Sequence, residues 1–151
     1  MDADQLLQAY AVQVAGEMGT NETTSTSQLM EYGKRHFAPE QFLGVHPAGH
    51  KVPRTKHRCF YIHNTLAGSG DGHWLATARE PGRPDLGFDS FGRTPGPGWQ
   101  PQLAGLRMTD SDLNQELDST RCGQICLGFG YVFLSLGRTD VSGTCSRFLN
   151  G

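Results

Sequence analysis

Two cysteines lie four positions apart in the stretch STRCGQICLG, Cys122 and Cys126, where a polar run meets an apolar segment. A thiol attacks as its thiolate, and the dipole and unpaired amides of a helix N-terminus stabilise a thiolate there. Asp118-Ser119-Thr120 supplies capping residues just before Cys122, and Gly123 leaves room for an approaching carbonyl. The pattern is typical of a nucleophile, although a free cysteine is more often a buried core residue.

A nucleophilic thiol needs a base, and the base needs an acceptor that orients it. His73 begins a strand-like run, and the two-residue period of a strand places its side chain on the face opposite Trp74. Asp89 follows sixteen residues later in the next such run, where a hairpin would place it beside His73. Each residue alone is more often an ordinary polar side chain, but with Cys122 they predict a Cys-His-Asp site.

Acyl transfer also needs hydrogen-bond donors directed at the oxygen that becomes negative. Gln115 precedes Cys122 by seven residues and could reach back across a turn to supply a side-chain amide. A single glutamine predicts nothing by itself, so this assignment depends on the other three residues.

Apolar periodicity predicts the elements that position these side chains. A helix is expected over Asp2–Met18, and a second over Ser27–His36, where Ser25 and Gln28 have the spacing of a capping box. Residues 42–58 read as a loop. The strand-like runs, which we expect to be adjacent and antiparallel, are Cys59–Asn64, His73–Arg79 and Leu86–Phe91, with a fourth strand near Leu103–Met108.

The final predicted element, Cys122–Leu136, is apolar nearly all round and is therefore expected to be a buried helix, despite the helix-weakening Gly128 and Gly130. The order of helices, strands and buried helix predicts an α+β fold. In it, a small central, mostly antiparallel sheet packs on the helix that carries Cys122 at its N-terminus. We divide the chain into an N-terminal helix with a polar linker, residues 1–26, and a main domain, residues 27–151.

Composition excludes some classes of protein. The 151 residues carry a formal net charge of -2, which argues against a chain that coats nucleic acid or anionic membrane. The sequence begins without a secretory signal and contains no apolar run of the roughly 20 residues that a membrane span needs, so we expect a soluble intracellular protein with reduced thiols. One basic run could touch a nucleic-acid backbone, although a solvated loop is the simpler interpretation; its charged residues are Lys51, Arg54, Lys56 and Arg58.

A set of ordered motifs resembles the signature of the adenovirus-type cysteine proteases, the adenain family, within the larger group of SUMO and ubiquitin-like-modifier proteases. The matching residues are Phe42-Leu43-Gly44, Asn64-Thr65, Gly72-His73-Trp74, Asp89-Ser90-Phe91-Gly92, Gln115 and Cys122-Gly123. The likeness covers roughly residues 27–136.

The resemblance implies a role for each candidate. Cys122 would attack, His73 would act as base and acid, and Asp89 would orient the imidazole. Gln115 and the Cys122 amide would hold the oxyanion. The adenoviral enzymes have glutamate where this chain has Asp89, but the modifier proteases use aspartate. The implied fold is a circularly permuted papain-like arrangement, with residues 27–151 as the protease domain.

The same resemblance implies a thiol endopeptidase without a cofactor, which cuts proteins at small or glycine-containing sites bound near Trp74 and Gly123. A viral maturation protease would act on precursor proteins in the host nucleus and in the virion. The alternatives are a ubiquitin-like-modifier protease of the deSUMOylase or deubiquitinase type, some relatives of which transfer acetyl groups, and a binding module of this fold without turnover.

Three further features give expectations. The region before Gln115 lacks the cysteine through which the adenoviral enzymes tether an activating peptide, so a disulfide-linked peptide is not expected. Leu66-Ala67-Gly68-Ser69-Gly70 resembles an adenoviral cleavage pattern, with a cut after Ser69, but also suits a flexible hairpin. A zinc site is the rival to the protease site, although the spacing of its candidate ligands is irregular; they are His46, His50, His57, Cys59 and His63.

Overall fold

A computed structural model describes residues 3–20, 24–47, 50–64, 73–89, 107–108 and 122–149, and the side chains of residues 3, 4, 107, 108 and 136–149 are not described. The elements in chain order are α1 (Ala3–Met18), α2 (Thr26–His36), β1 (Phe42–His46), β2 (Cys59–Asn64), β3 (Trp74–Arg79), β4 (Leu86–Phe88), β5 (Arg107–Met108) and α3 (Cys122–Leu149). The predicted α+β class is confirmed.

The strands form one sheet in the order β1-β2-β3-β4-β5. The central pairs β2–β3 and β3–β4 are antiparallel, as predicted, but the edge pairs β1–β2 and β4–β5 are parallel. The sheet is therefore mixed, and the prediction of a mostly antiparallel sheet is wrong at both edges. A parallel edge strand is difficult to predict because its partner is set by a crossover connection rather than by a local hairpin.

The prediction of a loop over residues 42–58 is wrong for Phe42–His46, which form β1. This strand is irregular: Gly44 has φ 97°, and the pairing with β2 shifts register between Phe42 and Val45. Only glycine adopts such a backbone readily, and the shift destroys the two-residue alternation by which strands are recognised.

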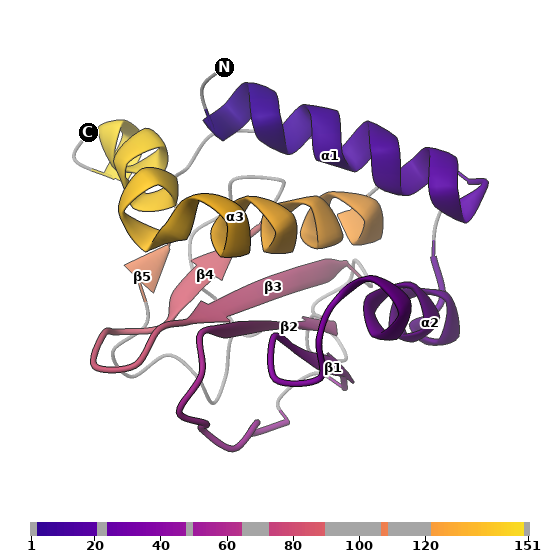
Figure 1. Ribbon diagram of the computed structural model, residues 1–151, viewed down its shortest axis with the longest axis horizontal. Coiled ribbons are helices and arrows are strands. Elements are labelled where there is room, and N and C mark those ends of the chain that lie inside the picture. The colour runs from indigo at the N-terminus through magenta and orange to yellow at the C-terminus, as the bar shows by residue number, and fades with distance from the viewer. Residues whose placement is uncertain are drawn as a thin grey trace.

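The molecule is built in layers, with α3 lying between the sheet and α1 (Figure 1). The first residues of α3 and the last residues of α1 meet at the end of the molecule where α2 lies, so α1 and α3 run antiparallel. Leu7, Ala11 and Val14 of α1 belong to the same buried core as the sheet and α3. The division of the chain at residue 26 stays a prediction.

Local signals predicted both N-terminal helices correctly. Ser25 caps α2, its hydroxyl accepts from the Gln28 amide at 3.1 Å, and the Gln28 side chain accepts from the Ser25 amide at 2.8 Å. The capping box is thus confirmed. The helix α3 continues to Leu149 instead of ending at Leu136. An apolar run predicts which residues of a helix are buried, and it does not by itself predict where the helical backbone ends.

The glycines of α3 allow its neighbours to approach closely. A Cβ on Gly128 would lie 3.1 Å from the backbone nitrogen of Ala11, and one on Gly130 would overlap the ring of Phe60. Side chains at these two positions would push α3 away from α1 and from β2. The glycines therefore lower the helix propensity of α3 but allow α1 and the sheet to pack closely against its two sides.

Candidate active site

The sheet brings His73 and Asp89 to one end of two neighbouring strands. His73 directly precedes β3, Asp89 directly follows β4, and the antiparallel register pairs Ala76 with Phe88. The Nε2–H of His73 donates to the Asp89 Oδ1 across 2.7 Å, and both side chains are buried. The hairpin predicted from the sequence therefore places this pair in direct contact.

Cys122 reaches the same place from α3, of which it is the first residue. Its Sγ accepts a hydrogen bond of 3.5 Å from the backbone amide of Trp74, and it also hydrogen-bonds to the His73 ring. Because Nε2 is already bonded to Asp89, Nδ1 is the ring nitrogen that faces the thiol. Three residues from three elements thus form one chain of contacts, from carboxylate to imidazole to sulfur.

The electrostatics of this chain favour a charged imidazole. Burial is the largest influence on the pKa of His73 and lowers it, but the hydrogen bonds and charges of Asp89 and Cys122 together outweigh burial. The pKa of His73 consequently rises from 6.5 to about 9. An imidazolium between a carboxylate and a thiol is the arrangement that keeps a thiolate available near neutral pH.

Cys126 lies one helical turn after Cys122 and is fully buried. Its thiol donates to the Trp74 carbonyl across 3.5 Å, and burial raises the pKa of this thiol well above its ordinary value. A neutral, buried thiol is a poor nucleophile. Cys126 is therefore a core residue that supports the backbone of Trp74, and it forms no disulfide with Cys122.

The two predicted substrate-binding residues lie beside the sulfur. Trp74 is buried, and its indole Nε1–H donates to the backbone carbonyl of Thr24 across 3.1 Å. A Cβ on Gly123 would collide with the Thr24 Oγ1, so Thr24 fills the space beside Gly123. Sequence reasoning missed Thr24, which lies in a threonine-rich stretch that resembles a polar linker.

Two expectations lie outside the described residues. Gln115, the proposed oxyanion donor, and the Leu66–Gly70 segment with its cut after Ser69 both belong to parts of the chain whose placement the structure does not describe. Both stay predictions.

The side chains of the rival zinc site do not converge. The His46 Nε2 lies 2.8 Å from the Leu43 carbonyl oxygen, and the His63 Nε2 lies 3.2 Å from the Thr77 hydroxyl. Within the described ranges no group of three or more His, Cys, Asp or Glu side chains could hold a metal ion. The zinc interpretation has no support from these residues.

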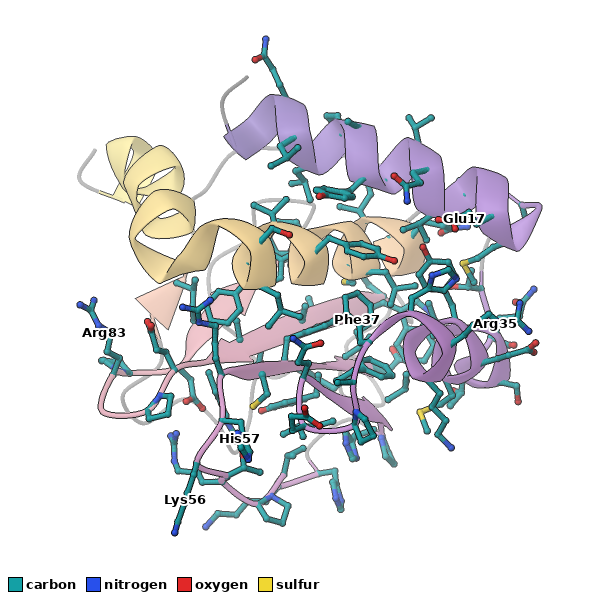
Figure 2. The ribbon with its side chains drawn as sticks, viewed as in Figure 1. Glu17, Arg35, Phe37, Lys56, His57 and Arg83 are labelled. Carbon is teal, nitrogen blue, oxygen red and sulfur yellow. The ribbon has the colours of Figure 1, made fainter. Side chains whose placement is uncertain are left out.

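Some of the charged residues in the basic run before β2 form ion pairs within the protein. Arg54 pairs with the buried carboxylate of Asp85 at 3.0 Å, and Arg58 lies 3.7 Å from Glu80. Lys51 and Lys56 are exposed. Figure 2 shows Lys56 at the outer end of this loop, on the side of the sheet away from α3. A nucleic-acid contact here stays a prediction, with fewer free charges than the sequence suggests.

No described helix combines the length and the hydropathy that a membrane span requires. No protein-family model matches this chain, and no curated protein is similar to it in sequence. The geometry of Cys122, His73 and Asp89 therefore carries the functional argument.

Proposed function

We propose that this chain is a cysteine endopeptidase in which Cys122 is the nucleophile, His73 the general base and acid, and Asp89 the residue that orients the imidazole. The observation that carries the proposal is the buried His73 ring, bonded through Nε2 to Asp89 and in contact with the Cys122 thiol at the start of a helix. A cysteine that only filled the core would need neither a charged neighbour nor a helix N-terminus, so these two features favour a reactive thiol at Cys122.

The proposed reaction begins with the Cys122 thiolate, which attacks the carbonyl carbon of the scissile bond while the C=O electron pair moves onto oxygen. The C–N bond then breaks, and the departing nitrogen takes a proton from His73, which leaves a thioester on Cys122. Neutral His73 next takes a proton from water, whose oxygen attacks the thioester carbon. Cys122 departs as a thiolate beside the reprotonated His73.

The chain order of the triad supports the finer assignment of the fold. The base and the acid come from the sheet before the nucleophile's helix, the reverse of the order in papain, and this agrees with the proposed circularly permuted papain-like arrangement. Gln115 would supply the second oxyanion donor, beside the Cys122 amide. Trp74 is buried beside the sulfur and Thr24 fills the space beside Gly123, which supports the preference for small or glycine-containing sites.

The proposed substrates are proteins. The motif likeness favours viral precursor proteins cleaved during maturation, in the host nucleus and the virion, without a cofactor or a disulfide-linked peptide. A ubiquitin-like-modifier protease is the alternative. Incubation with capsid precursor proteins and with ubiquitin-like fusions separates these two classes, because cleavage of the fusions alone would favour the modifier class.

A thiol-reactive peptide probe tests the nucleophile. We expect the wild type to be labelled at Cys122, the Cys122→Ala variant to lose labelling and peptide cleavage together, and the matched control Cys126→Ala to keep both. Equal labelling of the wild type and Cys122→Ala would refute the assignment. Labelling at Cys122 without cleavage of any peptide in a diverse library would instead indicate a binding module of this fold.

A further inference from the structure

The Thr24 hydroxyl is a buried donor that lacks a hydrogen-bond partner. Thr24 is 4% exposed, and its Oγ1 bonds to no other group in the part of the chain that the structure describes. An unpaired buried hydroxyl is costly, because it gives up its hydrogen bonds to water and receives none in return. Such a group in a native protein requires an explanation, and a catalytic role is one of those known.

The position of this hydroxyl points to the chemistry of a partner for it. Oγ1 lies against Gly123, in the first turn of α3, at the distance where a Cβ would collide. Thr24 and Cys122 also contact the same residue, because the Thr24 carbonyl accepts from the Trp74 indole and the Cys122 Sγ accepts from the Trp74 amide. The segment that precedes α2 therefore holds the hydroxyl against Gly123, the residue that follows the nucleophile.

The first amides of an α-helix lack intrahelical partners and are donors, and a threonine hydroxyl can also donate. A ligand that satisfies both must be an acceptor, such as a carbonyl oxygen or an oxyanion. We propose that the Thr24 hydroxyl donates a hydrogen bond to the acyl oxygen of the substrate when Cys122 attacks. This inference rests on the proposed cysteine protease function.

In the proposed step the Cys122 Sγ bonds to the acyl carbon, and the C=O electron pair becomes the lone pair of an alkoxide. The Thr24 O–H donates to this alkoxide without transferring its proton. The contact strengthens as negative charge develops on the oxygen, so it stabilises the transition state more than the bound substrate.

Two substitutions separate the hydroxyl from the shape of the side chain. Thr24→Val keeps the volume and removes the donor, whereas Thr24→Ser keeps the donor and removes a methyl group. Because the hydroxyl is unpaired in the free protein, Thr24→Val should leave the unfolding midpoint unchanged or raise it. A residue that only maintained the structure through its hydroxyl would lower the midpoint when that hydroxyl is lost.

Two probes of Cys122 separate the acyl oxygen from the thiol. Iodoacetamide alkylates the sulfur without forming an oxyanion, and a peptide aldehyde that ends in glycinal forms a tetrahedral adduct with an acyl oxygen. For Thr24→Val we expect a wild-type rate of Cys122 alkylation, followed by mass spectrometry, and an aldehyde affinity about tenfold weaker, the size of one good hydrogen bond. Thr24→Ser should bind the aldehyde within about twofold of wild type.

Other outcomes would overturn the inference. If Thr24→Val binds the aldehyde as tightly as wild type while wild-type Cys122 reacts readily, the hydroxyl does not contact the acyl oxygen, and the protease proposal stands without it. A parallel loss of alkylation rate, aldehyde affinity and stability in Thr24→Val would assign Thr24 a structural role. If wild-type Cys122 reacts with neither probe, the proposed function itself fails.

Discussion

Replacement of Asp89 by Asn tests the electrostatic core of the site. The variant keeps an oxygen that can accept from the His73 Nε2–H but removes the negative charge. In the wild type the pKa of His73 is raised from 6.5 to about 9, although burial alone lowers it. Without the Asp89 charge, burial meets less opposition and the pKa of His73 should fall towards or below 6.5.

Because folding raises the pKa of His73, the contribution of this residue to the free energy of unfolding depends on pH. A histidine whose pKa is raised by folding stabilises the protein fully below the unfolded pKa, and this contribution is lost as the pH rises through the folded pKa. The pH range over which this stabilisation is lost therefore runs from 6.5 to about 9. At about 1.4 kcal/mol per pKa unit, the wild type should lose about 3 kcal/mol of unfolding free energy across it.

Denaturant unfolding at several pH values between 6 and 10 measures this loss. Asp89→Asn should be less stable than wild type by up to about 3 kcal/mol near pH 6 and nearly equal to it near pH 10. Thiols also titrate in this range, so His73→Gln serves as the control, and only the pH dependence that it lacks belongs to His73. A difference between wild type and Asp89→Asn that stays constant from pH 6 to 10 would refute the reasoning.

Two other predictions concern packing and activity. Gly128→Ala should reduce the free energy of unfolding, measured by urea titration, by about 1–3 kcal/mol, because the added Cβ meets the backbone of α1. The control Gly16→Ala adds a Cβ that meets nothing within 4 Å, and it should raise the free energy of unfolding by up to about 1 kcal/mol. Peptide cleavage should decline above pH about 9, as His73 loses the proton that it gives to the leaving nitrogen, and a kcat that keeps rising to pH 10 would contradict this role.

Local patterns predicted the parts of the fold that depend on neighbouring residues. The strand Cys59–Asn64 has the predicted bounds, and the α2 capping box is made within four residues. In contrast, β1 was missed because Gly44 interrupts its alternation, and only the pairing with β2 makes it a strand. The extension of α3 beyond Leu136 was missed because Gly137, a residue type that often follows the end of a helix, comes directly after the apolar run.

The candidate site was predicted in part. His73, Asp89 and Cys122 could be chosen from the sequence because their residue types suit one chemistry, and two of them flank a predicted hairpin. Thr24 carried no such signal, because a threonine in a polar stretch has no local feature that distinguishes a linker from a segment packed on α3. The only sequence hint was indirect: Trp74 needs an acceptor for its indole, and Gly123 makes room for a neighbour.

The sequence by itself determined the residue types, the order of the candidate triad and the elements that carry its members. The tertiary structure decided the contacts of the two cysteines in CGQIC: Cys122, which the motif pattern already favoured, hydrogen-bonds to the imidazole, and Cys126 lies in the core. Periodicity cannot separate them, since residues four apart share a helix face. The packing of α3 on β3 separates the two cysteines, because the Cys122 sulfur accepts a hydrogen bond from the Trp74 amide whereas the Cys126 thiol donates one to the Trp74 carbonyl. Contacts over about 50 residues depend on sheet register and helix packing, which short-range patterns do not encode.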